Sequence, residues 1–218
     1  MQERTDRTFE IGNKEENSKR FPSNHISTAK YNAITFIPKA LLIQFKRYAN
    51  IYFLVVAILQ SIPAISPLNP ISAIAPLIFV ITLSVIREGL EDLARYRSDL
   101  ETNGQKTRVF RDGQLKEIDW KDVYVGDIVQ VKDREFFPAD IVVLHSSDPK
   151  GNCFIMTSSL DGEKNLKPRF AKEETQGMVS PAGINISGQI TCAPPNPDLY
   201  SFRGQLDSPG GQVFFGAK

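Results

Sequence analysis

Charged residues are missing from a long central stretch of this 218-residue chain. Between Tyr48 and Ile86, 39 residues pass without Asp, Glu, Lys, Arg or His, although 23% of the whole chain is charged. Cysteine and histidine are also scarce, with two of each and no Cys-x-x-Cys pair. These absences argue against a disulfide scaffold and against a zinc site. The net charge of +1 offers no reason to expect a nucleic-acid partner.

Two apolar runs, residues 48–66 and 71–86, make up the uncharged stretch, and the turn-forming sequence PLNP separates them. A helix rises about 1.5 Å per residue, so runs of about 16 to 19 residues reach roughly 24 to 28 Å, near the hydrocarbon thickness of about 30 Å. The stretch 48–86 therefore predicts a two-helix transmembrane hairpin. A buried helical hairpin of a soluble protein is the alternative, and it is disfavoured because the rest of the chain offers no apolar helices to cover it.

The segments around the hairpin predict its orientation. Basic residues precede the first run and follow the second, whereas the turn has none, so the positive-inside rule places both ends in the cytosol. Residues 1–29 are predicted to form a polar N-terminal tail, and residues 30–47 an amphipathic segment along the cytosolic interface. Residues 87–104 are predicted to continue the second run as a cytosolic stalk helix. The basic residues are Lys39, Lys46, Arg47, Arg87, Arg95 and Arg97.

Two polar residues, Gln60 and Ser61, lie near the far end of the first apolar run. Polar groups at membrane depth mark substrate paths or helix contacts, because lipid cannot satisfy their hydrogen bonds. The alternative is that both lie at the outer headgroup boundary, where they cost little. The residues alone favour this second interpretation.

From residue 105 onward, short β-like runs alternate with turn sequences. The runs are TRVF, LKEIDW, DIVQV, DIVVLHS and CFIMTSS, and the region after Pro168 has one or two further candidate strands. This spacing is typical of a small antiparallel sandwich or distorted jelly roll. The fold class expected for the whole chain is therefore an α+β membrane protein, with a two-helix hairpin followed by a cytosolic β-rich domain over 105–218. The sequence ends at GGQVFFGAK without an obvious cap, which predicts a truncated domain.

Several stretches together resemble the phospholipid-flippase branch, type IV, of the P-type ATPases. The segment STAKYNAITFIPKALLIQFKRYANIYFLVVAILQSIPAISP resembles the first membrane segment of that branch. DWKDVYVGDIVQVKDREFFPADIVVLHSSDP, TSSLDGEKNLKPR and TCAPPNPDLYSFRGQL resemble its actuator domain, in family order. The resemblance runs from about residue 20 to the C-terminus, and it reads residues 138–140, Pro-Ala-Asp, as fold-positioning. It also implies a substrate-path role for Gln60 and Ser61, which fall where some flippases have polar residues near the lipid headgroup route.

The resemblance implies the chemistry of the Asp161-Gly162-Glu163 loop. Such pumps phosphorylate an aspartate in a separate domain and then hydrolyse the aspartyl phosphate, with the actuator loop entering for the second step. Glu163 then orients or deprotonates the attacking water, as a general base does. Gly162 has no side chain and so allows the loop to approach the other domain closely. The family loop reads Asp-Gly-Glu-Thr, whereas Lys164 stands in the last position here. The bare sequence LDGE, by contrast, is typical of an ordinary hairpin turn.

As a pump, the protein is expected to move phospholipid from the outer or lumenal leaflet to the cytosolic leaflet of the plasma membrane or an endomembrane. The resemblance implies ATP and Mg²⁺ as cofactors, with no binding residues and no metal site in this chain, which has neither an Asp-Lys-Thr-Gly signature nor a nucleotide domain. Its implied partners are the phosphorylation and nucleotide domains and a small accessory glycoprotein. By itself the chain should be inactive. A non-catalytic membrane-anchored β-module or pump remnant is the alternative, and a cation pump is disfavoured because its loop typically reads Thr-Gly-Glu.

Overall fold

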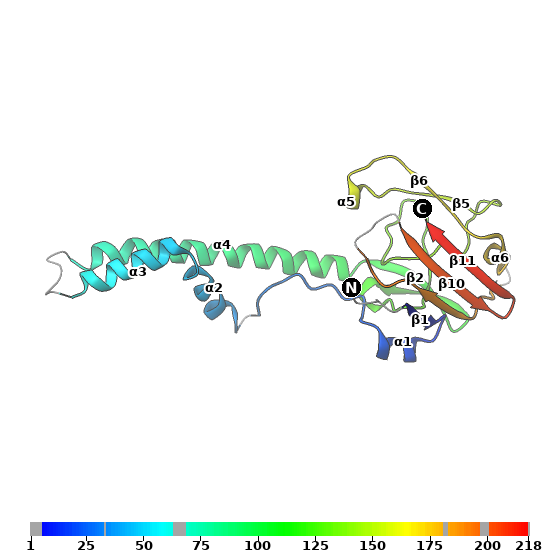
Figure 1. Ribbon diagram of the computed structural model, residues 1–218, viewed down its shortest axis with the longest axis horizontal. Helices are drawn as coiled ribbons and strands as arrows, with labels where there is room; N and C mark the ends of the chain where they lie inside the picture. The colour runs from blue at the N-terminus through cyan, green and yellow to red at the C-terminus, as the bar shows by residue number, and fades with distance from the viewer. Residues whose placement is uncertain (1–5, 33, 63–68, 181–182, 197–200, 218) are drawn as a thin grey trace. The chain divides into compact units, whose positions relative to one another are not determined.

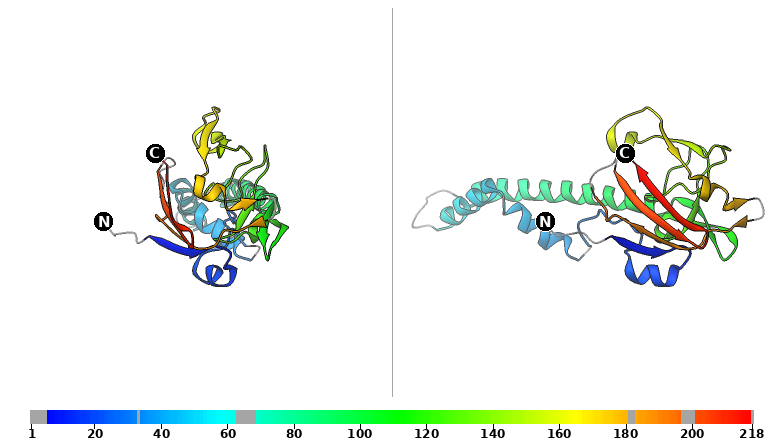
Figure 2. Two further views of the ribbon diagram at one scale, coloured as in Figure 1. Left: turned by 90° about the vertical axis from the view of Figure 1, so that its right-hand side faces the viewer. Right: turned by 45° about the vertical axis from the view of Figure 1, so that its right-hand side comes forward.

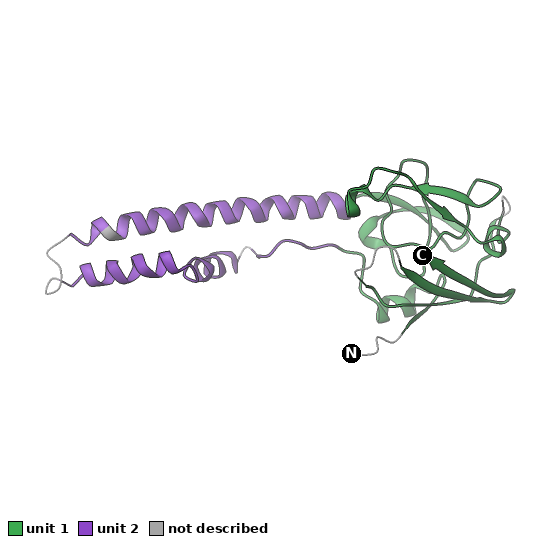
Figure 3. Ribbon diagram, turned by 45° about the horizontal axis from the view of Figure 1, so that its top comes forward, with its two compact units in different colours: residues 1–25, 104–218 green, residues 26–103 purple. Residues whose placement is uncertain are grey.

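The computed structural model describes the chain apart from residues 1–5, 33, 63–68, 181–182, 197–200 and 218. The chain divides into two compact units (Figure 3). Unit 1 joins residues 1–25 to residues 104–218, and unit 2 comprises residues 26–103.

A four-stranded antiparallel sheet forms the centre of unit 1 (Figure 1). Its strand order is β1-β9-β10-β11, with bounds Arg7–Glu10, Gln189–Cys192, Phe202–Ser208 and Gly211–Ala217. Alternate side chains of these strands point to one face and build the core. The buried members are Ile190, Leu206, Val213 and Phe215, with Phe9, Ile11, Val142, Leu144 and Cys192 packed against them.

The N-terminal segment contributes an edge strand to this sheet. In β1, Thr8 pairs with Thr191. The two residues are far apart in the chain, so no local sequence pattern predicts this pairing. Helix α1, Lys14–Arg20, follows β1, and the Asn13 side chain caps it by accepting the N–H of Glu16 at 3.2 Å. Asn17 is 2% exposed, and its amide donates to the carbonyls of Glu10 and Val125. Part of the segment expected to be a polar tail is thus folded into unit 1.

A second sheet of unit 1 has the order β3-β2-β4, with bounds Gln114–Asp119, Lys106–Arg111 and Ile128–Gln130. Asp112 and Gly113 join β2 to β3, and their φ angles of 55° and 76° are those of a tight type I′ hairpin turn. A single 3₁₀ turn, η1, Trp120–Asp122, follows β3. The strands expected from TRVF, LKEIDW and DIVQV are therefore confirmed.

Two of the expected strands need correction. DIVVLHS, residues 140–146, is not a strand; its Val142 and Leu144 pack on the core of the four-stranded sheet. The backbone of Ser146 bonds instead to the Gln176 side chain, with N to Oε1 at 2.9 Å and Nε2 to O at 2.7 Å. CFIMTSS is a strand only as far as Ile155, where β5 ends.

The remaining elements of unit 1 are small. Strand β5, Asn152–Ile155, pairs antiparallel with β6, Lys167–Phe170, and the two enclose a loop with the helical turn α5, Ser158–Asp161. Helix α6, Glu173–Gln176, and the short pair β7, Val179–Ser180, and β8, Gly183–Ile184, follow before β9 (Figure 2). The β-rich domain is thus several small sheets.

Unit 2 is helical. Helices α2, Phe36–Gln44, and α3, Tyr48–Gln60, precede α4, which runs unbroken from Ile71 to Asn103. The second apolar run and the expected stalk are therefore one helix, which stops directly before Gly104. Gly89 allows α2 to pack on α4, because a Cβ at this position would lie 2.9 Å from the Phe36 ring.

No single helix among the described residues is both long enough and apolar enough to cross a membrane. Helices α2 and α3 meet the criteria only as a pair, and they are bent by 87° at the break between them. The predicted two-helix transmembrane hairpin is thus not seen as two spanning helices. The end of its first run and the first half of its turn, residues 63–68, lie outside the described residues.

Three polar side chains of α4 hold the extended segment of residues 26–31. Their spacing of seven and then four residues places them on one face of the helix. Asp99 accepts the N–H groups of Thr28 and Ala29 at 2.7 and 3.1 Å, and it also accepts the Thr28 hydroxyl at 2.7 Å. Charge-assisted bonds of this kind contribute about 1.5–3 kcal/mol each. The other two are Asp92, bonded to the N–H groups of Lys30 and Tyr31, and Asn103, bonded to both backbone groups of Ile26.

Candidate functional site

The loop between β5 and β6 begins from a well-anchored strand. In the preceding turn, the Asp148 carboxylate accepts the N–H of Lys150 at 3.1 Å and the side-chain amide of Asn152 at 2.6 Å. These two hydrogen bonds, the backbone one foremost, lower the pKa of Asp148. Gly151, with φ +73°, completes the turn, where a Cβ would lie 3.0 Å from the Ala171 carbonyl. The base of the loop is therefore fixed at β5.

Gly162 reverses the chain after the helical turn α5. Its φ of +76° lies in the left-handed region, and its N–H donates to the carbonyl of Ser158 at 3.1 Å. This is how helices commonly end, and glycine adopts the conformation without strain. A Cβ at this position would meet no atom within 4 Å. The structure therefore gives Gly162 a conformational role, and it leaves open space around the loop.

Asp161 points into the loop. Its side chain is 9% exposed, and it accepts the Thr157 hydroxyl at 2.7 Å and the Glu163 N–H at 2.9 Å. The Lys167 ammonium also contacts its Oδ2 atom. A carboxylate with three donors around it is a structural anchor. Asp161, one of the residues predicted to take part in the chemistry, therefore has a structural role and holds the loop together.

Glu163 is the exposed carboxylate of the loop. Its side chain is 57% exposed, and its Oε2 lies 2.9 Å from Nζ of Lys167. Among the ion pairs of the described residues, it is Lys167, and not the adjacent Lys164, that pairs with Glu163. Sequence reasoning missed Lys167, although its spacing of four residues from Glu163 was visible.

The β5–β6 ribbon that carries the loop has an exposed apolar face. Phe154 pairs with Pro168 and Asn152 pairs with Phe170, so these four residues point to one side. Phe154 and Phe170 are 66% and 62% exposed. Cys153 points to the other side, where burial raises the pKa of its thiol.

Pro138 of the Pro-Ala-Asp stretch is buried, whereas Ala139 and Asp140 are exposed. The Asn24 amide donates to the carbonyls of Trp120 and Pro138 at 2.8 and 2.9 Å, and so ties this stretch to the N-terminal segment. This contact supports the fold-positioning interpretation of Pro138.

Gln60 and Ser61 lie at the C-terminal end of α3. The Ser61 hydroxyl donates to the Ala57 carbonyl at 2.7 Å, one helical turn back. Gln60 accepts a long hydrogen bond of 3.4 Å from the Ser72 hydroxyl, near the start of α4. Both polar groups thus have partners within unit 2, and the contacts do not form a binding site by themselves.

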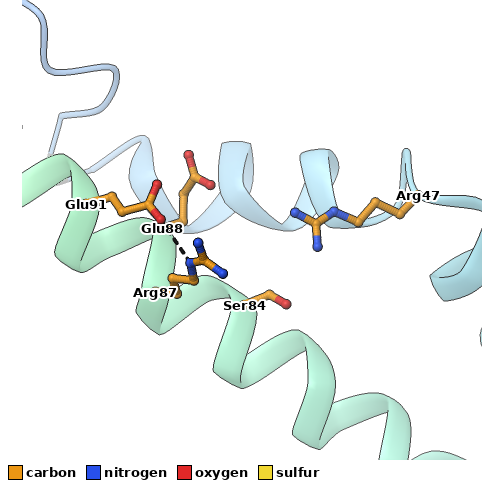
Figure 4. A pocket seen from close by; sticks show the side chains of 5 residues that line it. All are labelled: Arg47, Ser84, Arg87, Glu88 and Glu91. Atoms are coloured by element: carbon orange, nitrogen blue, oxygen red, sulfur yellow. Dashed lines mark hydrogen bonds and ion pairs between the residues drawn. The ribbon is translucent and has the colours of Figure 1, made fainter.

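Unit 2 also has an open cavity of about 270 Å³ lined by charged side chains from α4 and by Arg47 (Figure 4). Arg87 binds Glu91 with Nε 2.9 Å from Oε1, so these charges largely compensate each other. The remaining lining residues are Ser84 and Glu88. None of the predicted site residues lies in this cavity.

Two buried polar residues lie where α2 gives way to α3. Gln44 is 1% exposed and Asn50 is 5% exposed. The Asn50 amide donates to the Gln44 carbonyl at 2.8 Å, whereas Oε1 of Gln44 has no hydrogen-bond partner among the described residues. Sequence reasoning missed both, because they stand in apolar surroundings.

The described residues contain no group of three or more His, Cys, Asp or Glu side chains that could hold a metal ion. No glycine-rich phosphate loop occurs in the sequence either.

Comparison with known proteins gives matches in both units. Residues 9–74 match the family described as "Phospholipid-translocating ATPase N-terminal", and residues 101–193 match "P-type ATPase actuator domain". The chain is 47% identical over 197 residues to the phospholipid-transporting ATPase 6 of Arabidopsis thaliana, covering 89% of this chain and 16% of that protein.

A phospholipid-transporting ATPase of Schizosaccharomyces pombe is 44% identical over 187 residues, or 85% of this chain and 15% of that protein. The chain thus spans about one sixth of the length of these curated relatives. The two family matches occur in the order expected from the resemblance, the N-terminal family before the actuator domain. By its sequence, the chain belongs to the phospholipid-transporting family of P-type ATPases.

Proposed function

We propose that this chain is the N-terminal part of an ATP-driven flippase that moves phospholipid from the outer or lumenal leaflet to the cytosolic leaflet. Within it, the Asp161-Gly162-Glu163 loop removes the phosphoryl group from an aspartyl phosphate on the phosphorylation domain. The observation that carries the proposal is the geometry of the loop. Its one exposed carboxylate, Glu163, is held by Lys167, while Asp161 is folded inward.

In this reaction Glu163 accepts a proton from the attacking water or orients it. A carboxylate performs this task when the water lies within hydrogen-bond reach, and the exposure of Glu163 allows such an approach. Gly162 adds no side chain that would obstruct docking, and no described atom of this chain beyond its two neighbours lies within 4 Å of the place where a Cβ would be. Asp161 keeps the loop in shape. ATP and Mg²⁺ supply the phosphoryl group and charge neutralisation in the phosphorylation and nucleotide domains, and an accessory glycoprotein completes the proposed assembly.

We further propose that the uncharged stretch crosses the bilayer as a hairpin, with its flanks and the β-rich domain in the cytosol. The exposed apolar side chains of α3 and of the first half of α4 support this proposal, since water would disfavour so much apolar surface. Gln60 and Ser61 then lie near the outer headgroup region, where we place the entry of the lipid path. The membrane concerned is the plasma membrane or an endomembrane.

A labelling experiment tests the hairpin. In a chain whose Cys153 and Cys192 are replaced by serine, a cysteine at Asn69 should react with an impermeant maleimide applied to the outer or lumenal side. A cysteine at Lys46 should react only after the membrane is opened, because the positive flank stays cytosolic. Labelling of both positions from the same side, without permeabilisation, would refute the hairpin.

The flippase proposal is tested with a chimaera of the Arabidopsis relative in which the matched segment is replaced by the corresponding residues of this chain. We expect lipid-stimulated ATP hydrolysis and uptake of labelled phospholipid from the outer leaflet. A chimaera with the matched segment of the Schizosaccharomyces pombe relative is the control, because it places the segment of another phospholipid-transporting ATPase in the same host. If the control is active and this chain's chimaera, at equal abundance, is not, the non-catalytic membrane-anchored module becomes the better description.

A further inference from the structure

Lys167 contacts both carboxylates of the candidate loop, those of Asp161 and Glu163. It is the first residue of β6, and its side chain is only 15% exposed. Its Nζ contacts Oδ2 of Asp161 and lies 2.9 Å from Oε2 of Glu163. We propose that Lys167 is a positioning residue that holds the Glu163 carboxylate in the orientation needed for dephosphorylation. This inference rests on the proposed function of the loop.

The Lys167 ammonium is a fixed charge. Asp161, its first partner, is 9% exposed and is itself held by the Thr157 hydroxyl and by the N–H of Glu163. The backbone of Lys167 is held as well, because β6 pairs with β5 and places Lys167 opposite Ile155. A lysine anchored at both its backbone and its ammonium group presents its charge at one place, unlike a surface lysine that samples many rotamers.

Among the described residues, the partner of the Glu163 carboxylate is Lys167. The Glu163 side chain is 57% exposed and follows Gly162, so without Lys167 the carboxylate would sample several rotamers. Lys167 binds Oε2, and we assign Oε1 to the attacking water. An ordered carboxylate costs less entropy to align in the transition state than a mobile one does.

The charges of the cluster agree with this role. Two carboxylates share one ammonium, so Asp161, Glu163 and Lys167 together carry a net charge of −1 (−1 −1 +1). Asp161 takes the more buried contact, and Glu163 keeps its exposed position. The ammonium thus orients Glu163 without burying it. A purely structural role for Lys167, as a staple for the loop, would have the same contacts and must be separated by experiment.

The test uses the active chimaera of the Arabidopsis relative and follows the decay of its radiolabelled phosphoenzyme after a chase with unlabelled ATP. Lys167→Met should slow the decay about tenfold, since the interaction energy between residues in contact typically corresponds to a change in rate of about this size. Lys167→Arg should restore most of the rate, because it retains a cation at this position. Lys172→Met, an exposed lysine just beyond β6, is the matched control and should leave the decay unchanged.

The decisive measurement is a double-mutant cycle with Glu163→Gln. If Lys167 acts through Glu163, adding Lys167→Met to Glu163→Gln should slow the decay no further. Independent, additive slowing by the two changes would show a structural staple and overturn the inference. A Lys167→Met variant that decays like the parent would overturn it as well. A Glu163→Gln variant that decays normally would instead overturn the proposed function, so the two failures are distinguishable.

Discussion

Glu163→Gln is expected to slow hydrolysis of the aspartyl phosphate by about 10²- to 10⁴-fold in the active chimaera, the usual contribution of a general base. The amide has nearly the shape of the carboxylate, but it cannot take a proton from the attacking water. Phosphorylation by ATP should proceed normally, because the loop acts only in the second step. The phosphoenzyme should therefore accumulate, and lipid uptake should stop. Acid-stable incorporation of labelled phosphate from ATP, followed over time, measures both effects.

Glu174→Gln provides the control for this experiment. Glu174 is an exposed glutamate in α6, so its substitution makes the same chemical change in the same unit. Its phosphoenzyme should decay as in the parent. Should Glu163→Gln behave like Glu174→Gln, the assignment of Glu163 would be wrong, whatever the fate of lipid transport.

Arg111→Met should strongly lower the stability of unit 1. Arg111 reaches Asp127 with Nε 2.9 Å from Oδ1 and with Nη2 against Oδ2, and both side chains are largely buried, at 17% and 5% exposure. Asp127 also accepts the N–H of Tyr124 at 2.7 Å, which ties the turn before β4 to β2. Removing the arginine leaves a buried carboxylate without its cation, a change that costs about 3–5 kcal/mol.

For a unit of this size, such a loss corresponds to a decrease in melting temperature of roughly 10 °C. Thermal unfolding of the whole chain in detergent, followed by circular dichroism of the β signal, measures it. Arg134→Met is the matched control, because Arg134 and Asp133 form an ion pair in which both side chains are more than nine-tenths exposed, at 92% and 93%. Its effect should stay below about 1 kcal/mol. Equal shifts for both variants would show that burial of the Arg111 pair contributes nothing.

Local sequence patterns were sufficient to predict those features that depend on residues close together in the chain. The absence of charge from Tyr48 to Ile86 is visible in the sequence alone, and so are strands β2, β3 and β4. The order of the actuator-like motifs indicates the family from the sequence alone. DIVVLHS was misread, because strand-like composition describes a buried extended segment as well as a hydrogen-bonded one.

The amino-acid sequence by itself determined the family, the uncharged stretch and the identity of the loop residues, because these depend on residues close together in the chain. Only the tertiary structure decided that β1 joins β9, that α4 holds residues 26–31, and that Asp161 is an anchor while Lys167 binds Glu163. Each of these depends on which backbone and side-chain groups approach one another after folding. Side-chain direction and burial, rather than residue type, then separate an exposed carboxylate from a structural one.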